Sequence, residues 1–254
     1  MENQAVLYEV QDQVAIITLN EPDSRNALSS SIRKGLWDAF SRLRDDSNAK
    51  VGIVTGIGKA FCAGAHLKEF AENKTAVPDR NIMPMLNRNI WVNKPVIAAV
   101  NGDALGGGFL LAQTCDLAIA ADNARFGMPE ARWGRGAPWS VPLLNMIPQR
   151  IWMEMALTGQ LIDANRAYSI GLLNDVVPIA SLMERSMELA QSIAAGAPLT
   201  IAATHKMVYL ATEMGRTAAW ETADAIFEKV YESEDALEGP LSFKEKRPPN
   251  WKGR

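Results

Sequence analysis

Two short stretches of small residues could each present a backbone N–H group to a bound molecule. The first is the segment 60–68, which contains Ala63-Gly64-Ala65, and the second is the segment 104–108, which ends in Gly106-Gly107-Gly108. Glycine and alanine let another molecule approach the backbone closely. Two N–H groups that converge on one carbonyl oxygen form an oxyanion hole, which stabilises negative charge developing on that oxygen. The glycines could also serve only a tight strand-to-helix turn, and they lack the G-x-G-x-x-G spacing of dinucleotide-binding loops.

A carboxylate suited to proton transfer follows the second stretch, at Glu130 in the sequence Phe126-Gly127-Met128-Pro129-Glu130. Its neighbours are mostly apolar, and burial among apolar side chains raises the pKa of a carboxyl group. The alternative is a solvated carboxylate in a surface loop. Other chemistries find less support, because His66 and His205 belong to no nucleophile motif and no His/Cys/carboxylate cluster has metal-ligand spacing.

Alternating strands and helices must position these residues. Hydrophobic spacing predicts strands at residues 8–10, 14–19, 50–56, 95–100 and 117–120 and around Phe126. It predicts helices at residues 29–44, with Ser29 or Ser30 as the N-cap, at 83–91, and at 109–114 after the triple glycine. The succession of strand, glycine loop and helix indicates βαβ units, followed by a loop over residues 129–140.

The chain after Arg150 is expected to be nearly all helical. Helices are predicted at residues 153–158, 164–170, 179–195, 199–211 and 216–231, followed by a tail rich in Lys, Arg and Pro. A polar segment over residues 71–80, which includes Pro78, is expected to be mobile.

Composition restricts the classes of protein to which the chain can belong. It has 254 residues, 48% of them hydrophobic and 22% charged, which is ordinary for a water-soluble globular protein. The net charge of −3 with scattered Lys and Arg argues against nucleic acid as a partner, and no apolar run reaches the length of a membrane span. No signal peptide is visible, and Cys62 and Cys115 are expected to be buried free thiols, so a cytoplasmic location is predicted.

The two stretches of small residues, in this order, resemble the enoyl-CoA hydratase/isomerase (crotonase) superfamily, and the resemblance runs the length of the chain. Further matching motifs are Asn20-Glu21-Pro22-Asp23-Ser24-Arg25-Asn26-Ala27-Leu28, Ala156-Leu157-Thr158-Gly159, Gly171-Leu172-Leu173-Asn174-Asp175-Val176-Val177-Pro178 and Phe243-Lys244-Glu245-Lys246-Arg247. The resemblance implies an α/β fold with a crotonase-like spiral of ββα units over residues 1–195. A C-terminal helical region over residues 196–254 would then mediate assembly into a homotrimer or a dimer of trimers. A few relatives bind RNA, but the acidic balance and the lack of a lysine-rich helix argue against it here.

The resemblance also implies roles for particular positions. The oxyanion hole would be formed by the N–H groups of Ala65 and Gly107. The substrate would be an acyl-CoA thioester, which carries its own coenzyme A, so no separate cofactor or metal is expected. Residues expected to contact the coenzyme A are Ser24, Arg25, Ala27, Ala63 and Leu67, together with Phe243 and Lys246 from a neighbouring subunit. A solvated basic tail is the simpler explanation for the last two.

The chain departs from the hydratase pattern in its carboxylates. Hydratases of this superfamily use one glutamate just after the triple glycine and another in a later Pro-Glu pair, and this chain has Leu110 at the first position and Glu130 at the second. Some relatives have an aspartate a little further on, where this chain has Pro138. A single carboxylate beside an oxyanion hole can remove a proton α to a thioester and return it elsewhere, as Δ3-Δ2 enoyl-CoA isomerases do.

We therefore predict enoyl-CoA isomerisation with Glu130 as the acid/base. The alternatives are hydration of a branched or carboxylated enoyl-CoA, acyl-CoA decarboxylation, and non-catalytic binding of an acyl-CoA. The predicted acyl pocket comprises His66, Leu110, Trp133, Arg135, Pro138 and Trp139. Arg135 could either pair with a carboxylate of the acyl group or lie in solvent. The two tryptophans are expected to be pocket walls or core, and His66 to point to the CoA entrance or to solvent.

Overall fold

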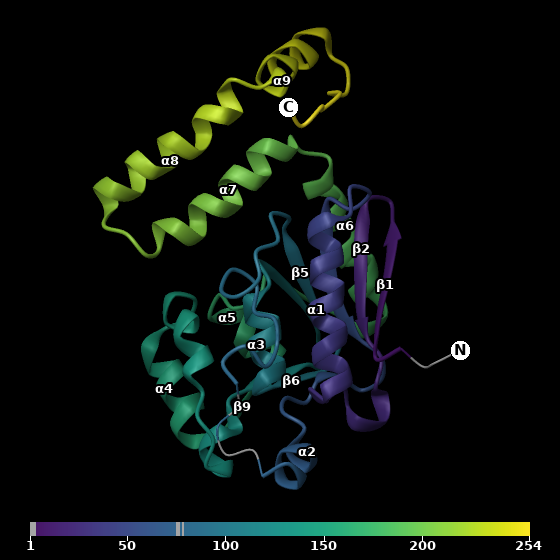
Figure 1. The fold of residues 1–254 in the computed structure, drawn as a ribbon, viewed down its shortest axis with the longest axis vertical. Coiled ribbons are helices and arrows are strands. Elements are labelled where there is room, and N and C mark those ends of the chain that lie inside the picture. The colour runs from purple at the N-terminus through teal and green to yellow at the C-terminus, as the bar shows by residue number, and fades with distance from the viewer. Residues whose placement is uncertain (1–3, 75–76, 78) are drawn as a thin grey trace.

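The core of the molecule is a six-stranded sheet, seen beside α1 in Figure 1. A computed structural model describes residues 4–74, 77 and 79–254. The strands lie in the order β1 (Val6–Gln11), β2 (Val14–Leu19), β3 (Val51–Gly56), β5 (Val96–Val100), β7 (Leu117–Ala121) and β10 (Asp175–Val177). The pair β1 and β2 is antiparallel, and the other neighbouring pairs are parallel.

Helices cover both faces of this sheet, because successive side chains of a strand point to opposite faces. On one face α1 (Ser30–Asp45) buries Leu36 and Phe40 in the same cluster as Ile17 of β2. On the other face α6 (Leu182–Ala194) packs against side chains that include Ile53 of β3. The predicted N-cap of the first helix is confirmed, since the Ser29 hydroxyl accepts a hydrogen bond of 3.1 Å from the N–H of Ile32.

A smaller, four-stranded sheet carries the candidate chemistry. Its order is β4 (Ala60–Cys62), β6 (Asp103–Leu105), β8 (Arg125–Gly127) and β9 (Leu161–Asp163). The strand β4 leads into α2 (Leu67–Glu72), β6 leads through the triple glycine into α3 (Gly107–Thr114), and β8 leads to Pro129-Glu130. Because β4, β6 and β8 are parallel neighbours, their carboxyl ends lie at one edge of the sheet, and the three segments that follow them are brought together.

Short helical elements connect these sheets to the C-terminal part of the chain. They are the 3-10 helices η1 (Pro22–Ser24), η2 (Pro129–Trp133), η3 (Pro138–Asn145) and η4 (Ile179–Ser181), and the α-helices α4 (Gln149–Thr158) and α5 (Ala164–Ser169). The segment 129–140, predicted as a loop, therefore contains two helical turns, each beginning with a proline at its first position.

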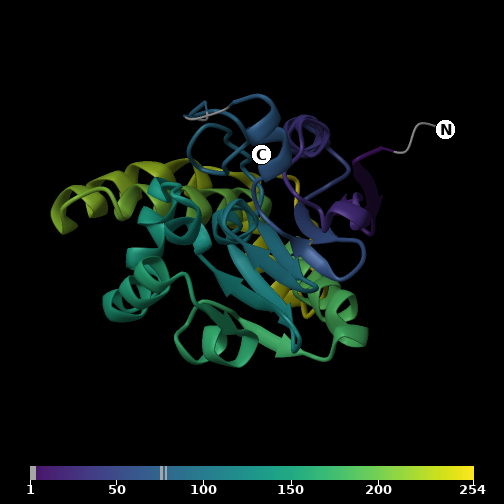
Figure 2. The same cartoon turned by 90° about the horizontal axis from the view of Figure 1, so that it is seen from below.

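Three helices, α7 (Pro198–Ala211), α8 (Arg216–Tyr231) and α9 (Glu234–Glu245), form the C-terminal region. In Figure 1 α7 and α8 lie side by side above the core, with α9 at the end of α8. Seen from below, the yellow-green helix pair projects to one side of the sheets (Figure 2). Of the helices described, none is both long enough and apolar enough to span a membrane. The predicted division at residue 195 stays a prediction.

The helix predicted at residues 83–91 is not present. Residues 83–91 form turns rather than a helix, because Asn87 adopts a left-handed conformation (φ 63°) and the Asn89 side chain accepts a hydrogen bond of 2.7 Å from the N–H of Met85. The C-terminal region, predicted to be helical, also contains the helix α9, for which no range was predicted; Ser233 caps it and it contains Pro240. The predicted mobile segment includes Glu72, which is helical, whereas Thr75, Ala76 and Pro78 lie outside the described residues.

Candidate active site

The two stretches of small residues meet at the predicted oxyanion hole. Gly64 has a φ of +89°, and a Cβ atom placed on it would collide with the carbonyl oxygen of Leu105 and lie 3.3 Å from the backbone nitrogen of Gly107. A Cβ on Gly107 would in turn lie 3.8 Å from the backbone nitrogen of Ala65. The two N–H groups that the resemblance names are thus on neighbouring backbone segments, and only glycine allows the segments to come this close.

Both N–H groups remain available to a ligand. Within the described part of the chain, neither the N–H of Ala65 nor that of Gly107 donates to a protein acceptor. Gly107 is the first residue of α3, and the first N–H groups of a helix have no partner inside it. A hydrogen bond of 2.8 Å from the N–H of Leu28 to the carbonyl of Gly64 fixes the neighbouring backbone. The helix dipole of α3 adds positive potential at this point.

The segment predicted to contact coenzyme A lies beside the first stretch. The N–H of Ala63 donates to the carbonyl of Arg25 over 3.0 Å, and Leu28 forms an isolated bridge with Ala65. Arg25 and Asn26 both have left-handed backbone conformations, and the buried Asn26 side chain donates to the carbonyl of Ala60 over 2.9 Å. The structure therefore brings the segment that contains Ser24 and Ala27 to the segment of Ala63.

The guanidinium group of Arg25 is held by a carboxylate while the side chain stays partly exposed to solvent. It pairs with Asp103 of β6, which is 5% exposed and which also accepts two hydrogen bonds of 2.8 Å from Arg125. Two cations on one buried carboxylate leave a net positive charge at the surface. The two arginine side chains are 55% and 54% exposed, which leaves them accessible to an anionic group.

Glu130 lies over the second stretch. Its Oε1 atom would be 3.0 Å from a Cβ atom on Gly106, whose φ of +52° and ψ of −117° favour glycine. The same oxygen accepts a hydrogen bond of 3.2 Å from the indole N–H of Trp139. The Oε2 atom is buried and has no hydrogen-bond partner among the described residues. Burial raises the pKa of Glu130, and hydrogen bonds from its own backbone N–H and from Trp139 oppose that rise.

The hydrogen bond that Trp139 donates to Glu130 was not predicted from the sequence. Trp139 was predicted as a pocket wall or as core, and the structure shows in addition a polar contact to the candidate base. The Gln113 side chain of α3 donates to the carbonyl of Trp139 over 2.7 Å, and the Phe109 ring packs edge-on against the indole with centroids 6.1 Å apart. A tryptophan usually finds a partner for its N–H when it is buried, and this was the available signal.

The family resemblance predicts that Leu110 and Pro138 stand where relatives have carboxylates, and neither side chain can transfer a proton. Leu110 is 6% exposed in the first turn of α3, and its N–H donates to the carbonyl of Gly106 over 2.9 Å. Pro138 opens η3. Among the described residues, no hydrogen bond or ion pair joins Glu130 to a second carboxylate.

The other predicted pocket residues lie around Glu130 with different degrees of exposure. Arg135 is half-buried, donates its backbone N–H to the carbonyl of Glu130 over 3.0 Å, and holds its guanidinium carbon 5.3 Å from the centroid of the Phe70 ring in α2. Trp133 is 63% exposed, so it is not part of the core. These contacts place Arg135 beside the candidate base, while its pairing with an acyl carboxylate stays a prediction.

His66 has a structural task that the sequence analysis did not foresee. Its Nδ1 atom accepts a hydrogen bond of 3.2 Å from the N–H of Glu69, so its side chain caps α2. The exposed Leu67 and Lys68 follow as the first residues of that helix. Glu69 in turn forms an ion pair of 2.7 Å with Arg33 of α1, which anchors the helix beside the predicted entrance.

Phe243 and Lys246 are distant from this site within one chain. Both belong to the end of α9, which lies at the opposite end of the long axis from α2 (Figure 1). Phe243 is 88% exposed. Their predicted contact with coenzyme A therefore needs a second copy of the chain.

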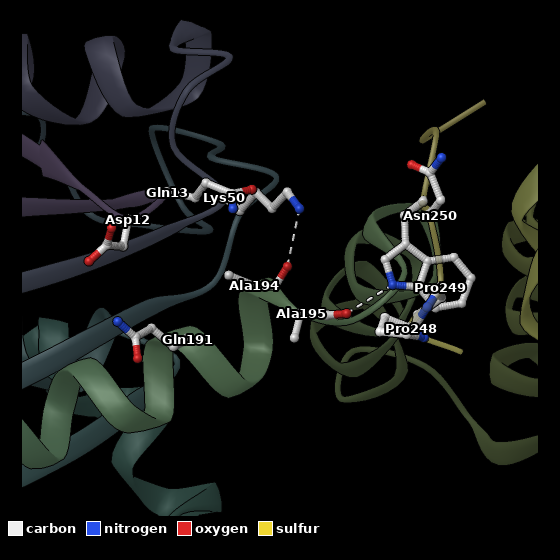
Figure 3. A pocket seen from close by; sticks show the side chains of 10 residues that line it. Asp12, Gln13, Lys50, Gln191, Ala194, Ala195, Pro248, Pro249 and Asn250 are labelled. Carbon is white, nitrogen blue, oxygen red and sulfur yellow. Dashed lines mark hydrogen bonds between the residues drawn. The ribbon is translucent and has the colours of Figure 1, made fainter. Parts of the chain in front are cut away.

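Both cysteines are buried, and one cavity lies away from the candidate site. Cys62 and Cys115 are both free and buried, as predicted, and burial raises the pKa of the Cys62 thiol to about 12. A cavity of about 540 Å³ lies between the β1–β2 turn, the end of α6 and the C-terminal segment (Figure 3). It is lined by Lys50 and Trp251, which donate to the carbonyls of Ala194 and Ala195, and by none of the predicted site residues.

Solved structures with the same architecture define the class of fold. An enoyl-CoA hydratase from Mycobacterium marinum is 37% identical, with a TM-score of 0.92 and coverage of 99% of this chain and 100% of that one. An enoyl-CoA hydratase from Bacillus anthracis is 32% identical, with a TM-score of 0.91 and coverage of 99% and 100%. The molecule therefore has the crotonase fold.

Sequence comparison leads to the family. The model of the family described as enoyl-CoA hydratase/isomerase matches residues 9–254. Carnitinyl-CoA dehydratase from Proteus mirabilis is 40% identical and is matched over 99% of this chain and 100% of its own length, and the Escherichia coli K12 protein of that name is 40% identical over 94% of each. The chain belongs to the enoyl-CoA hydratase/isomerase family, whose members are enzymes that act on acyl-CoA substrates.

Proposed function

We propose that the chain catalyses the Δ3-Δ2 isomerisation of an enoyl-CoA thioester, with Glu130 as the single acid/base. The observation that carries the proposal is the position of this carboxyl group, which lies against Gly106 and next to the predicted oxyanion donor Gly107. The apolar Leu110 fills the position at which a hydratase has its other glutamate. One base without a second proton donor suits a reaction in which the same proton is removed and returned.

In the proposed reaction the thioester carbonyl oxygen accepts hydrogen bonds from the N–H groups of Ala65 and Gly107. Glu130 removes a proton from C2 of the 3-enoyl group, and the electrons of the C–H bond enter a dienolate whose negative oxygen the two N–H groups stabilise. The protonated Glu130 then returns the proton to C4, so that the double bond moves from C3–C4 to C2–C3. One donor of an oxyanion hole is worth about 3–4 kcal/mol in other enzymes.

The electrostatics of Glu130 support this role. Burial raises its pKa, which makes the carboxylate a stronger base and the carboxylic acid stable enough to persist until the proton is returned. An acid/base catalyst works best when its pKa lies near the operating pH. A carboxylate retained in this setting also supports an enzyme over a non-catalytic acyl-CoA binder.

Hydration and dehydration are the second candidate function, and the names of the relatives favour them. The proteins cited above are called carnitinyl-CoA dehydratase and enoyl-CoA hydratase. For this chain, hydration would require Glu130 both to activate the water molecule and to supply the proton, since Leu110 can do neither. This is why we place isomerisation first.

We further propose that coenzyme A is bound between copies of the chain in a homotrimer or a dimer of trimers. Phe243 and Lys246 lie far from Glu130 in their own chain, as described above. Large apolar side chains are exposed on the C-terminal helices, among them Val208, Trp220, Tyr231 and Leu237. Exposed apolar surface of this kind supports a contact with another protein chain.

The test is a comparison of two substrates in D₂O with products identified by mass spectrometry. A 3-enoyl-CoA should be converted to the trans-2-enoyl-CoA, and Glu130→Gln should abolish the conversion. Glu184→Gln, which changes an exposed glutamate of α6, is the matched control and should retain it. Rapid conversion of trans-2-enoyl-CoA to 3-hydroxyacyl-CoA by the unaltered protein would instead establish the hydratase.

A further inference from the structure

The two carboxylate oxygens of Glu130 have different surroundings. Oε1 lies against Gly106 and accepts the hydrogen bond of 3.2 Å from the Trp139 indole. Oε2 is buried without a partner in the described structure. A buried carboxylate oxygen without a donor is costly, and a proton on that oxygen removes the buried negative charge. The surroundings thus favour Oε2 as the oxygen that carries a proton.

Trp139 is itself held in place on two sides. Its carbonyl accepts the 2.7 Å hydrogen bond from Gln113, and its ring packs edge-on against Phe109, both residues of α3. The next residue, Ser140, accepts a hydrogen bond of 3.2 Å at its carbonyl from the indole of Trp152. The indole N–H is therefore fixed relative to α3, the helix whose first residue is the predicted oxyanion donor Gly107.

We propose that Trp139 is a positioning residue that holds Oε1 of Glu130 as a hydrogen-bond acceptor, so that Oε2 alone takes the proton from the substrate and returns it. The proposal rests on the proposed role of Glu130 as the single acid/base. When Oε2 accepts the proton from C2, the C–H electrons enter the dienolate; when the Oε2–H bond breaks, the proton goes to C4. The carboxyl group need not rotate between the two transfers, because Oε1 keeps its donor throughout.

A fixed carboxyl group has a measurable consequence in the fate of the transferred proton. A proton that stays on one buried oxygen exchanges slowly with solvent, so a 3-enoyl-CoA dideuterated at C2 should deliver deuterium to C4 in ordinary water. In Trp139→Phe a smaller aromatic ring replaces the indole and its N–H is lost, so the carboxyl group becomes free to rotate. We expect a lower fraction of deuterium at C4 and a kcat about tenfold lower, with little change in KM.

The pH profile separates positioning from simple packing. The hydrogen bond from Trp139 lowers the pKa of Glu130, so its loss should move the acidic limb of the kcat profile to higher pH. Trp91→Phe, which changes an exposed tryptophan outside the predicted site, should leave both the limb and the deuterium transfer unchanged. If Trp139→Phe lowers kcat but leaves both readouts as in the unaltered protein, the proposal is overturned.

Two further measurements test the role of Trp139 if Trp139→Phe does not fold or if the protein shows no isomerase activity. Replacement of Trp139 by benzothienylalanine keeps the shape of the indole and removes only its N–H. If Trp139→Phe fails to fold, this replacement should show the effects expected for that variant: less deuterium at C4 and an acidic limb at higher pH. The carboxyl ¹³C signal of Glu130, assigned with Glu130→Gln, should titrate at higher pH in either Trp139 variant. If the unaltered protein does not isomerise 3-enoyl-CoA, the proposed function fails, whereas an unmoved titration overturns the role of Trp139.

Discussion

The Oδ1 atom of Asp116 lies 2.8 Å from the Nε2 atom of His205, and this contact joins the core to the C-terminal helices. The same oxygen accepts a hydrogen bond from the hydroxyl of Tyr209, one turn further along α7. The other oxygen accepts the N–H of Val96 at the start of β5 over 2.7 Å. Burial and the charge of Asp116 raise the pKa of Tyr209, which keeps its hydroxyl a donor. A single carboxylate therefore connects α7 with the central sheet.

Asp116→Ala is expected to lower the free energy of unfolding by about 3 kcal/mol or more. It would leave three donors without their acceptor in a largely buried place, and each such group costs roughly 1–3 kcal/mol. Urea denaturation at neutral pH measures the effect. Asp224→Ala, at an exposed position of α8, is the control and should stay within about 0.5 kcal/mol of the unaltered protein. Equal stability of the two variants would contradict this role.

Gly64→Ala should destroy the oxyanion hole. The added Cβ would collide with the carbonyl oxygen of Leu105 and crowd the nitrogen of Gly107, at a φ of +89° that alanine tolerates poorly. We expect kcat/KM to fall by about 10²-fold or more, the usual cost of removing one donor. Gly215→Ala adds a Cβ that meets nothing within 4 Å and should leave steady-state kinetics unchanged. Retention of full activity by Gly64→Ala would place the carbonyl oxygen elsewhere.

The pH dependence of isomerisation should report the raised pKa of Glu130. The carboxylate is the active base, so kcat/KM should increase with pH as Glu130 loses its proton. Because burial raises the pKa, this increase should fall above the range of a solvated glutamate. Initial rates with a 3-enoyl-CoA across the stability range of the protein give the profile. A midpoint at or below the ordinary glutamate value would contradict burial as the dominant effect.

The same shift predicts how Glu130 affects stability. Between the ordinary glutamate pKa and the raised pKa, the folded protein keeps a proton on Glu130 that the unfolded chain has released. The free energy of unfolding therefore falls as pH rises through the raised pKa. Below the ordinary glutamate pKa both states are protonated and the penalty disappears. Glu130→Gln should therefore raise the midpoint of thermal unfolding at neutral pH and have little effect in acid. A pH-independent difference would point to packing instead.

A matched pair of lysines tests the binding of coenzyme A between subunits. Lys246→Ala should raise KM for the acyl-CoA by about threefold to tenfold, because it removes a charge from the proposed neighbouring site. Lys244→Ala removes another exposed charge from the same end of α9 and should have little effect. Equal increases in KM would show that the basic tail acts only through its overall charge. Light scattering on the same samples gives the number of subunits.

The parts of the fold that could be predicted from sequence depend on local spacing. The apolar positions of α1 and its cap at Ser29 were found because a helix repeats its buried face and needs a partner for its first N–H groups. The turns at residues 83–91 were missed because the left-handed Asn87 and the side-chain contact of Asn89 carry no periodic signal. No range was predicted for the helix α9, which contains Gly239 and Pro240, two residues that weaken a helical signal.

The convergence of the three candidate segments could be predicted from sequence, the contacts of their side chains could not, and the roles of the residues stay predictions. Ala65, Gly107 and Glu130 follow three parallel strands whose ends the sheet brings together, as motifs in order along the chain indicated. The contact between Trp139 and Glu130 depends on the path of two short 3-10 helices, which is set by packing against α3 and not by local sequence. Capping of α2 by His66 was readable in principle, because the side chain at an N-cap accepts a backbone N–H.

Cys62 could serve as a reporter of how often the site opens. It ends the strand β4 just before the first stretch of small residues, and its carbonyl contacts the position of a Cβ on Gly108 of α3. Since its thiol has a pKa of about 12 and is fully buried, alkylating reagents should react with it only in molecules whose β4–α3 contact has separated. The rate of labelling, with and without a tightly bound acyl-CoA, would then measure how far ligand binding slows the fluctuations of the loops themselves.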